Sequence, residues 1–142
     1  MTFTAREKTS VVIESPKVRQ ESQPIHEPRG VIALHPVGGA AITPRRLQVD
    51  LGMGTTMWVD EDGSPIPPLS LSLSPGETEQ FLIFVNPQPG RNQWHLELPV
   101  LLDGKRLLLP IKDKGKRFTT YGLDGFDMYR WYNGEWERQD QL

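Results

Sequence analysis

The chain contains no cysteine among its 142 residues. This absence excludes disulfide cross-links, thiolate metal sites and a cysteine nucleophile. No run of about 18 apolar residues occurs, so we expect no membrane-spanning helix and no membrane partner. Residues 1–20 are polar and lack the apolar stretch of a secretory signal peptide. Together these absences predict a cytoplasmic protein.

The sequence also lacks the local signatures of common catalytic sites. It has no Gly-x-Ser-x-Gly element around a serine nucleophile and no phosphate-binding glycine loop that leads into a helix. His26, His35 and His95 have no metal-ligand spacing, and nothing in the chain indicates a cofactor or a metal. His95 and Glu97 would share one strand face, where an acid–base pair is conceivable, but we expect a surface pair on a sheet. We therefore predict that the protein is not an enzyme, although a site assembled from scattered residues remains the second alternative.

Charge and composition limit the classes of fold and of binding partner that remain for this protein. With 16 basic and 18 acidic residues, the formal net charge is −2, which argues against general attraction to nucleic acid or anionic membranes. Glycine and proline occur 13 times each, above the usual proportions of about 7 % and 5 %. This enrichment predicts many turns and few long helices. The hydrophobic fraction of 37 % is enough for the core of one domain.

Short apolar segments separated by turn residues predict an all-β fold. Leu69, Leu71 and Leu73 alternate with serines, which predicts a strand with one buried face. Residues 81–85 are continuously apolar, which predicts a central strand covered on both faces. No segment shows the 3.6-residue spacing of an amphipathic helix. Further strands are expected at 31–34, 47–51 and 55–59, so the pattern indicates an antiparallel sandwich or barrel.

Two hairpins can be predicted with their registers. Asp103-Gly104 suits a two-residue type I′ turn, which places Val100 opposite Leu107 and Leu98 opposite Leu109. Asn133-Gly134 suits the same turn type near the end of the chain. In that second hairpin, one face would carry Tyr129, Trp131, Trp136 and Arg138. This face either caps a hydrophobic core or is an exposed platform, and the sequence leaves both open.

The first 29 residues are predicted to be a flexible polar arm. They include Pro16, Pro24 and Pro28 and too few apolar residues to offset the entropy of ordering. We therefore expect removal of residues 1–29 to leave the fold intact. Val11-Val12-Ile13 is the apolar part of the arm and could add as an edge strand, here or on a partner. Residues 30–138 would form the β-sandwich domain, and 139–142 a C-terminal tail.

Residues 69–121 resemble the later half of an immunoglobulin-like or fibronectin-type β-sandwich. The resemblance is carried by Ser74-Pro75-Gly76-Glu77, by the strands at 81–85 and 94–98, and by the Asp103-Gly104 turn. The cysteine pair of antibody domains is missing. The resemblance implies an immunoglobulin-like antiparallel sandwich. By analogy it also implies a binding or spacer module rather than a particular activity.

Two groups of residues are candidate binding surfaces. Trp, Tyr and Arg are enriched at binding hot spots, which makes the second hairpin a candidate. Its candidate residues are Tyr129, Trp131, Trp136 and Arg138. A run of basic residues could instead contact phosphate, or could simply keep a sheet edge soluble. The basic candidates are Arg106, Lys114, Lys116 and Arg117.

The sequence therefore predicts a noncatalytic module for protein–protein interaction or assembly. It would bind a protein partner or a second copy of itself through the aromatic hairpin or an exposed sheet edge. The alternative is a carbohydrate-binding module that uses tryptophans as stacking platforms. The candidate platforms are Trp58, Trp94, Trp131 and Trp136.

Overall fold

The computed structural model describes residues 2–24, 31–34, 44–123 and 126–139. Within these ranges the chain forms strands and turns and no helix. The strands are β1 (Thr2–Thr4), β2 (Thr9–Ile13), β3 (Lys17–Gln23), β4 (Val31–Leu34), β5 (Arg45–Asp50), β6 (Thr55–Val59), β7 (Leu69–Leu73), β8 (Thr78–Asn86), β9 (Arg91–Leu102), β10 (Lys105–Ile111), β11 (Phe118–Tyr121), β12 (Asp127–Tyr132) and β13 (Glu135–Gln139). The protein is therefore all-β, as the alternation of apolar residues predicts.

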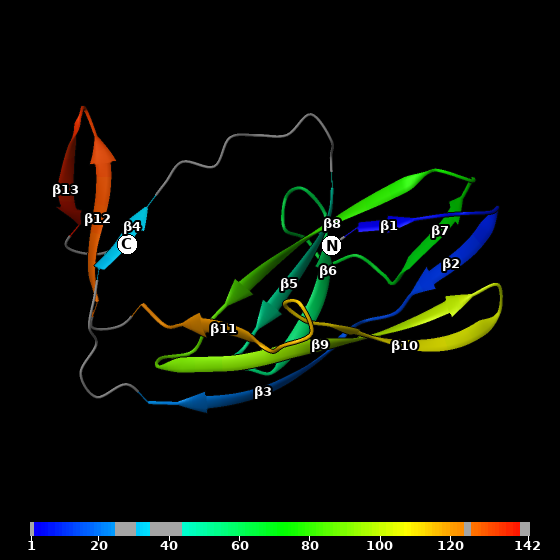
Figure 1. Cartoon of the computed structure of the whole chain (residues 1–142), viewed down its shortest axis with the longest axis horizontal. Helices are drawn as coiled ribbons and strands as arrows, with labels where there is room; N and C mark the ends of the chain where they lie inside the picture. Colours follow the sequence, from blue (N-terminus) through cyan, green and yellow to red (C-terminus); the bar gives the residue numbers. More distant parts are fainter. Residues whose placement is uncertain (1, 25–30, 35–43, 124–125, 140–142) are drawn as a thin grey trace.

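The strands form three sheets (Figure 1). The first has the order β1-β8-β5-β6, and the second has the order β10-β9-β2-β7 with β3 and β11 also paired to β9. The third is small and has the order β13-β12-β4. Most neighbours are antiparallel, but β5 with β8 and β12 with β4 are parallel. The sheets are thus largely but not wholly antiparallel.

The first two sheets share one hydrophobic core. Its largest fully buried apolar side chains include Trp58, Phe81 and Leu47 from the first sheet and Ile13, Leu96 and Leu98 from the second. The Phe81 ring centre lies 5.7 Å from that of Trp58 and 5.4 Å from that of Phe3, and both pairs meet edge to face. The third sheet contributes no described side chain to this core.

Strand β9 organises the second sheet because four other strands pair along it. Its N-terminal part lies between β3 and β11, and its C-terminal part between β2 and β10. Every second side chain of β9 faces the core, and each of these is at most 3 % exposed. They are Asn92, Trp94, Leu96, Leu98 and Val100. A register shift of one residue would expose the whole set to solvent.

A buried asparagine joins the start of β9 to its neighbours. Asn92 is 0 % exposed, yet both ends of its amide are hydrogen-bonded. Nδ2 donates to the carbonyls of Gln88 (2.8 Å), Gly90 (3.3 Å) and Thr120 (3.2 Å), and Oδ1 accepts the Ser22 hydroxyl (2.9 Å). Because its polar atoms have partners, burial of this amide costs little, and it holds β9 against β3 and β11.

The hairpin of β9 and β10 has the predicted register. Asp103 and Gly104 have φ values of 48° and 80°, as a type I′ turn requires. Val100 pairs with Leu107, and Leu98 pairs with Leu109. The turn residues and the apolar alternation on both strands agree, which explains why this hairpin can be predicted from sequence.

Two prolines lie in this hairpin without breaking its ladder. Pro99 and Pro110 occupy positions whose backbone groups point away from the partner strand. The Pro99 nitrogen therefore faces the break between β2 and β3, where the Pro99 carbonyl accepts the Glu14 N–H at 3.1 Å. Pro110 faces the outer edge of β10. Proline is tolerated at both positions because no ladder donor is lost.

The flexible N-terminal arm is not confirmed. β1 pairs with β8, β2 with β7 and β9, and β3 with β9. Val11 and Ile13 are 6 % and 0 % exposed, so β2 is part of the core. Taken alone, this segment is too polar to form a core of its own. Its few apolar side chains are buried in the core shared with the first sheet, and its backbone pairs with β9, which a distant part of the chain supplies.

The segment expected as an arm is not separate from the expected sandwich domain. β1, β2 and β3 pair within the two larger sheets, together with strands from 45–121. Gln139, expected in a C-terminal tail, is the last residue of β13. Residues 25–30 of the expected arm and 140–142 of the expected tail lie outside the described residues.

The prediction that residues 81–85 are covered on both faces is wrong. Phe81 is 1 % exposed, but Leu82 and Phe84 are 39 % and 49 % exposed. The second sheet covers only the face of β8 that carries Phe81, and Leu82 and Phe84 lie on the opposite face. A continuous apolar run therefore does not establish that both faces of a strand are buried.

Replacing Ile13 tests whether β2 belongs to the core. Ile13→Ala should lower the free energy of unfolding by about 2–5 kcal/mol, because it removes a fully buried side chain. Urea denaturation followed by tryptophan fluorescence measures this change. Val12→Ala is the matched control, since Val12 is the adjacent residue and only partly buried. An Ile13 variant no less stable than the Val12 variant would contradict the assignment of β2 to the core.

Candidate functional site

The hairpin of β12 and β13 also has the predicted register. Asn133 and Gly134 have φ values of 50° and 88°, as a type I′ turn requires. Trp131 lies opposite Trp136, as predicted. The residues that alternate onto one side of this hairpin, called here the aromatic face, are Tyr129, Trp131, Trp136 and Arg138.

The two tryptophans of the aromatic face are half-exposed. Trp131 is 48 % and Trp136 is 47 % exposed, and neither belongs to the hydrophobic core. The three-stranded sheet lies to one side of the two larger sheets (Figure 1). Of the two options that the sequence left open, the structure therefore excludes a cap on the main core and places the rings at the surface.

The ring geometry gives the aromatic face its shape. The ring centres of Trp131 and Trp136 are 5.2 Å apart with an angle of 66° between the planes, which is a favourable edge-to-face contact. On the same face, Arg138 Nη2 donates to Asp127 Oδ1 at 2.6 Å. Rings at this angle do not form one flat surface.

A third strand supports this hairpin. β12 pairs in parallel with β4 over Asp127–Arg130 and Val31–Leu34. An isolated two-stranded hairpin is marginally stable in water, whereas three strands can persist. The pairing with β4 therefore explains how the aromatic face is held outside the main core. Among the described strands, β13 is the outer strand of this sheet, and it carries Trp136 and Arg138 of the aromatic face.

The basic candidates do not act as one cluster. Lys114 and Lys116 lie in an exposed tight turn, in which Lys114 has a φ of 47°. Arg106 and Arg117 are each bound by a carboxylate from the N-terminal segment. The ion pairs are Arg106–Glu14 and Arg117–Glu21, both at 3.1 Å. Two of the four cations are thus neutralised, and the other two lie in a solvated loop.

For two of the four tryptophans predicted as carbohydrate platforms, the prediction is wrong, because their side chains are buried. Trp58 and Trp94 are 1 % and 3 % exposed. Their indole N–H groups donate inside the protein, from Trp58 to the Glu14 carbonyl at 3.3 Å and from Trp94 to Thr120 Oγ1 at 2.9 Å. Both rings are core residues, and only the two tryptophans of the aromatic face are accessible.

The His95–Glu97 pair also contacts a cation from β3. Both side chains lie on one face of β9, with His95 Nε2 4.0 Å from Glu97 Oε1. Arg19 Nε binds the other Glu97 oxygen at 3.0 Å, which neutralises the carboxylate. Among the described residues, no group of His, Asp and Glu side chains could hold a metal ion. The described part of the chain also has no helix long and apolar enough to cross a membrane.

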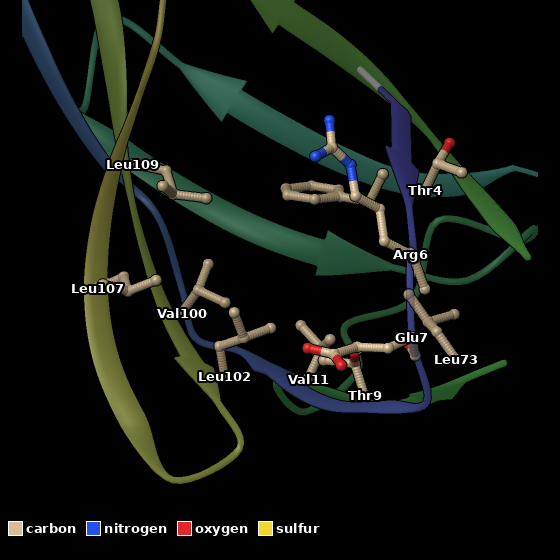
Figure 2. Close-up of a pocket in the computed structure, with 12 residues that line it drawn as sticks. Thr4, Arg6, Glu7, Thr9, Val11, Leu73, Val100, Leu102, Leu107 and Leu109 are labelled. Atoms are coloured by element: carbon tan, nitrogen blue, oxygen red, sulfur yellow. The ribbon is translucent and has the colours of Figure 1, made fainter. Parts of the chain in front are cut away.

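An apolar pocket was missed by the sequence analysis. It has a volume of about 370 Å³ and is bounded by β1, the β1–β2 connection and the β9–β10 hairpin (Figure 2). Arg6 and Glu7 line it, although the sequence placed both in a flexible arm. No local signal could have found this pocket, because its two sides are about 100 residues apart in the chain and meet only after the sheets form.

β5 ends at Asp50, whose carboxylate forms a hydrogen bond that orders the following turn. Its Oδ1 accepts the Met53 N–H at 2.8 Å, and its Oδ2 accepts the Asn86 amide at 3.1 Å. The Met53 backbone N–H, and next the Asn86 amide, hold the pKa of Asp50 below its usual value because they stabilise the carboxylate. The stability from these bonds is present above the unfolded pKa and is lost as the pH falls through the lowered pKa.

Asp50→Asn should therefore make stability less sensitive to acid. The wild-type protein loses the contribution of the Asp50 carboxylate below about pH 4, whereas the variant has no such proton to bind. Thermal melting followed by circular dichroism from neutral to acidic pH measures the difference. Equal acid dependence in the two proteins would show that the Asp50 hydrogen bonds contribute nothing to stability.

Comparison with protein-family models, with characterised proteins and with solved structures found no match for this chain. The all-β class comes from the structure itself, and the immunoglobulin-like resemblance has no further support from relatives. A functional assignment therefore depends on the geometry of the aromatic face.

Trp131→Ala should cost less than about 1 kcal/mol of stability, the range of a cross-strand aromatic pair on an exposed sheet. Trp58→Ala removes the same side chain from the core and should cost about 3–5 kcal/mol. Equilibrium denaturation of both variants gives the comparison. A Trp131 variant as unstable as the Trp58 variant would show that the aromatic face is needed for folding.

Proposed function

We propose that this protein is a noncatalytic module for protein–protein interaction or assembly and that it binds through the aromatic face. The observation that carries the proposal is the exposure of Trp131 and Trp136, each about half accessible on a sheet that contributes no described side chain to the core. Soluble proteins seldom leave several large aromatic rings together at the surface unless the patch has a partner.

The composition of the aromatic face suits a binding hot spot. Trp, Tyr and Arg contribute most of the energy in many interfaces, usually inside a polar rim. Here Trp131 and Trp136 are already packed against each other, so little side-chain entropy is lost on binding. The adjacent pair of Arg138 and Asp127 supplies part of the rim.

An exposed sheet edge lies beside the same residues. Among the described strands, only β12 pairs with β13, and a strand from a partner would add along the outer edge of β13. It contains no proline that would prevent such pairing. The other form of strand exchange, donation of Val11-Val12-Ile13 to a second copy, is not proposed, because β2 is already paired on both sides.

The finer architecture is part of this proposal. A core shared by two sheets supports an immunoglobulin-like sandwich. The parallel pairing of β5 and β8 departs from the antiparallel sheets of that fold. A carbohydrate-binding module is not favoured, since the 66° angle between the Trp131 and Trp136 planes prevents both rings from stacking on one flat sugar face.

The double variant Trp131→Ala/Trp136→Ala tests the proposal. Sedimentation velocity measures self-association, and affinity purification with quantitative mass spectrometry from cells that express the protein measures partner binding. The double variant should weaken the principal association at least about 30-fold, as expected for loss of hot-spot residues. The matched control is Met53→Ala, because Met53 is 77 % exposed in the β5–β6 turn and far from these strands in sequence.

An association that is lost in the Met53 variant as well, or unchanged in the double variant, would contradict the proposal. Saturable binding to a glycan array that depends on Trp131 and Trp136 would contradict it differently, because the face would then recognise sugar rather than protein.

A further inference from the structure

The apolar pocket lies at the end of the second sheet that carries the β9–β10 turn. Figure 2 shows Leu107, Leu109, Val100 and Leu102 on one side and the segment from Thr4 to Glu7 on the other. The volume of about 370 Å³ lies within the range of about 300–1,000 Å³ that is usual for small-molecule sites. This pocket shares no residue with the aromatic face.

The pocket exists because the two larger sheets do not cover each other completely. β1 is the outer strand of the first sheet, and the β9–β10 hairpin extends past it. Val100 is buried at 3 %, but Leu102 on the same face is 37 % exposed. Leu107 and Leu109 continue this apolar surface toward the outer edge of the hairpin. An apolar molecule in the pocket would remove these side chains from water.

The two strands beside the pocket are poor templates for an added strand. β1 has only three residues, and very short edge strands are one way in which proteins prevent edge pairing. On the other side, Pro110 places its nitrogen on the outer edge of β10 and so removes a backbone donor there. The occupant that fits is therefore a small molecule rather than a peptide strand.

The mouth of the pocket carries charged side chains that have no ion-pair partner within the described part of the chain. Arg6 and Glu7 extend from the β1 side across the pocket (Figure 2). Neither forms an ion pair with any residue in the described ranges, and Lys8 and Lys105, which flank the lining residues, do not either. Two further carboxylates lie on residues next to the lining: Asp103 accepts the Ser10 N–H at 2.9 Å, and Glu77 accepts the Ser74 N–H at 2.8 Å. The guanidinium group of Arg6 is therefore available to bind a carboxylate through two parallel hydrogen bonds.

We propose that this pocket binds a small amphipathic anion: an unbranched aliphatic chain lies against Leu102, Leu107 and Leu109, and its carboxylate head pairs with Arg6. Glu7 opposes the head and limits its affinity. This site is independent of the aromatic face, and neither proposal requires the other.

The test uses three probes with the same eight-carbon chain and different heads: octanoate, octan-1-ol and octyltrimethylammonium. Each is titrated into the ¹⁵N-labelled full chain, and amide chemical shifts give both the affinity and the location. Octanoate should bind most tightly and octyltrimethylammonium least tightly, with shifts concentrated at residues 3–11 and 100–109. The shifts of β12 and β13 should not change.

Two charge variants at the mouth should act in opposite directions. Arg6→Gln should weaken octanoate binding about 2- to 5-fold, the range of an exposed ion pair. Glu7→Gln should strengthen octanoate binding by a similar factor. Neither variant should change the affinity for octan-1-ol. Because Arg6 and Glu7 are exposed, we expect both variants to fold as the wild type does.

A pair of leucine variants tests the apolar wall. Leu107→Gln should abolish binding of both octanoate and octan-1-ol, whereas Leu108→Gln should leave both unchanged. The two residues are adjacent in β10, but Leu108 lies on the opposite face and is 59 % exposed. Leu102→Gln is the second wall variant if Leu107→Gln fails to fold, because Leu102 is partly exposed.

Three results would overturn the proposal. The first is the absence of saturable shifts with octanoate. The second is equal affinity for octanoate, octan-1-ol and octyltrimethylammonium, which would mean that Arg6 does not bind the carboxylate. The third is a dimer that dissociates in the Leu107 variant, because a second copy of the chain would then occupy the pocket.

Discussion

The alternation of side chains along β9 is the constraint on which the rest of the structure depends. This strand has 12 residues, and its buried face runs without interruption from Asn92 to Val100. Because its two edges pair with β2 and β3 on one side and β10 and β11 on the other, the N-terminal and C-terminal parts of the chain meet on it. Any change of register would expose the core and detach all four neighbours at once.

Features set by neighbouring residues could be predicted from the sequence, and features set by distant ones could not. The two hairpins at Asp103-Gly104 and Asn133-Gly134 have their predicted registers because turn residues and alternation are local. β3 was missed and β2 was expected only as a possible edge strand, because both pair with β9, roughly 80 residues further along the chain. The same limit applies to the site: the sequence identified which residues share the aromatic face, but its exposure depends on what the hairpin packs against.

The candidate function follows from a separation of roles within the chain. Trp58 and Trp94 are fully enclosed and belong to the two sheets that share the core. Trp131 and Trp136 belong to a third sheet that is stabilised by its own turn, its own ring contact and the third strand β4. A surface built in this way can vary its side chains without loss of the core, which is what a recognition surface on a stable scaffold requires. The pocket beside β1 has a different origin, since it arises where two sheets of unequal extent fail to cover each other.

Native-state hydrogen exchange of the backbone amides tests the central claim most directly, because it measures the stability of each strand separately. If β9 holds the domain together and the aromatic face lies outside the core, the amides of β9 that pair with β2, β3, β10 and β11 should exchange only through global unfolding. The amides that pair β12 with β13 should exchange through a local opening of lower free energy, with no dependence on the unfolding of β9. A single shared free energy for both sets, or faster exchange in β9 than in the β12–β13 hairpin, would contradict the account.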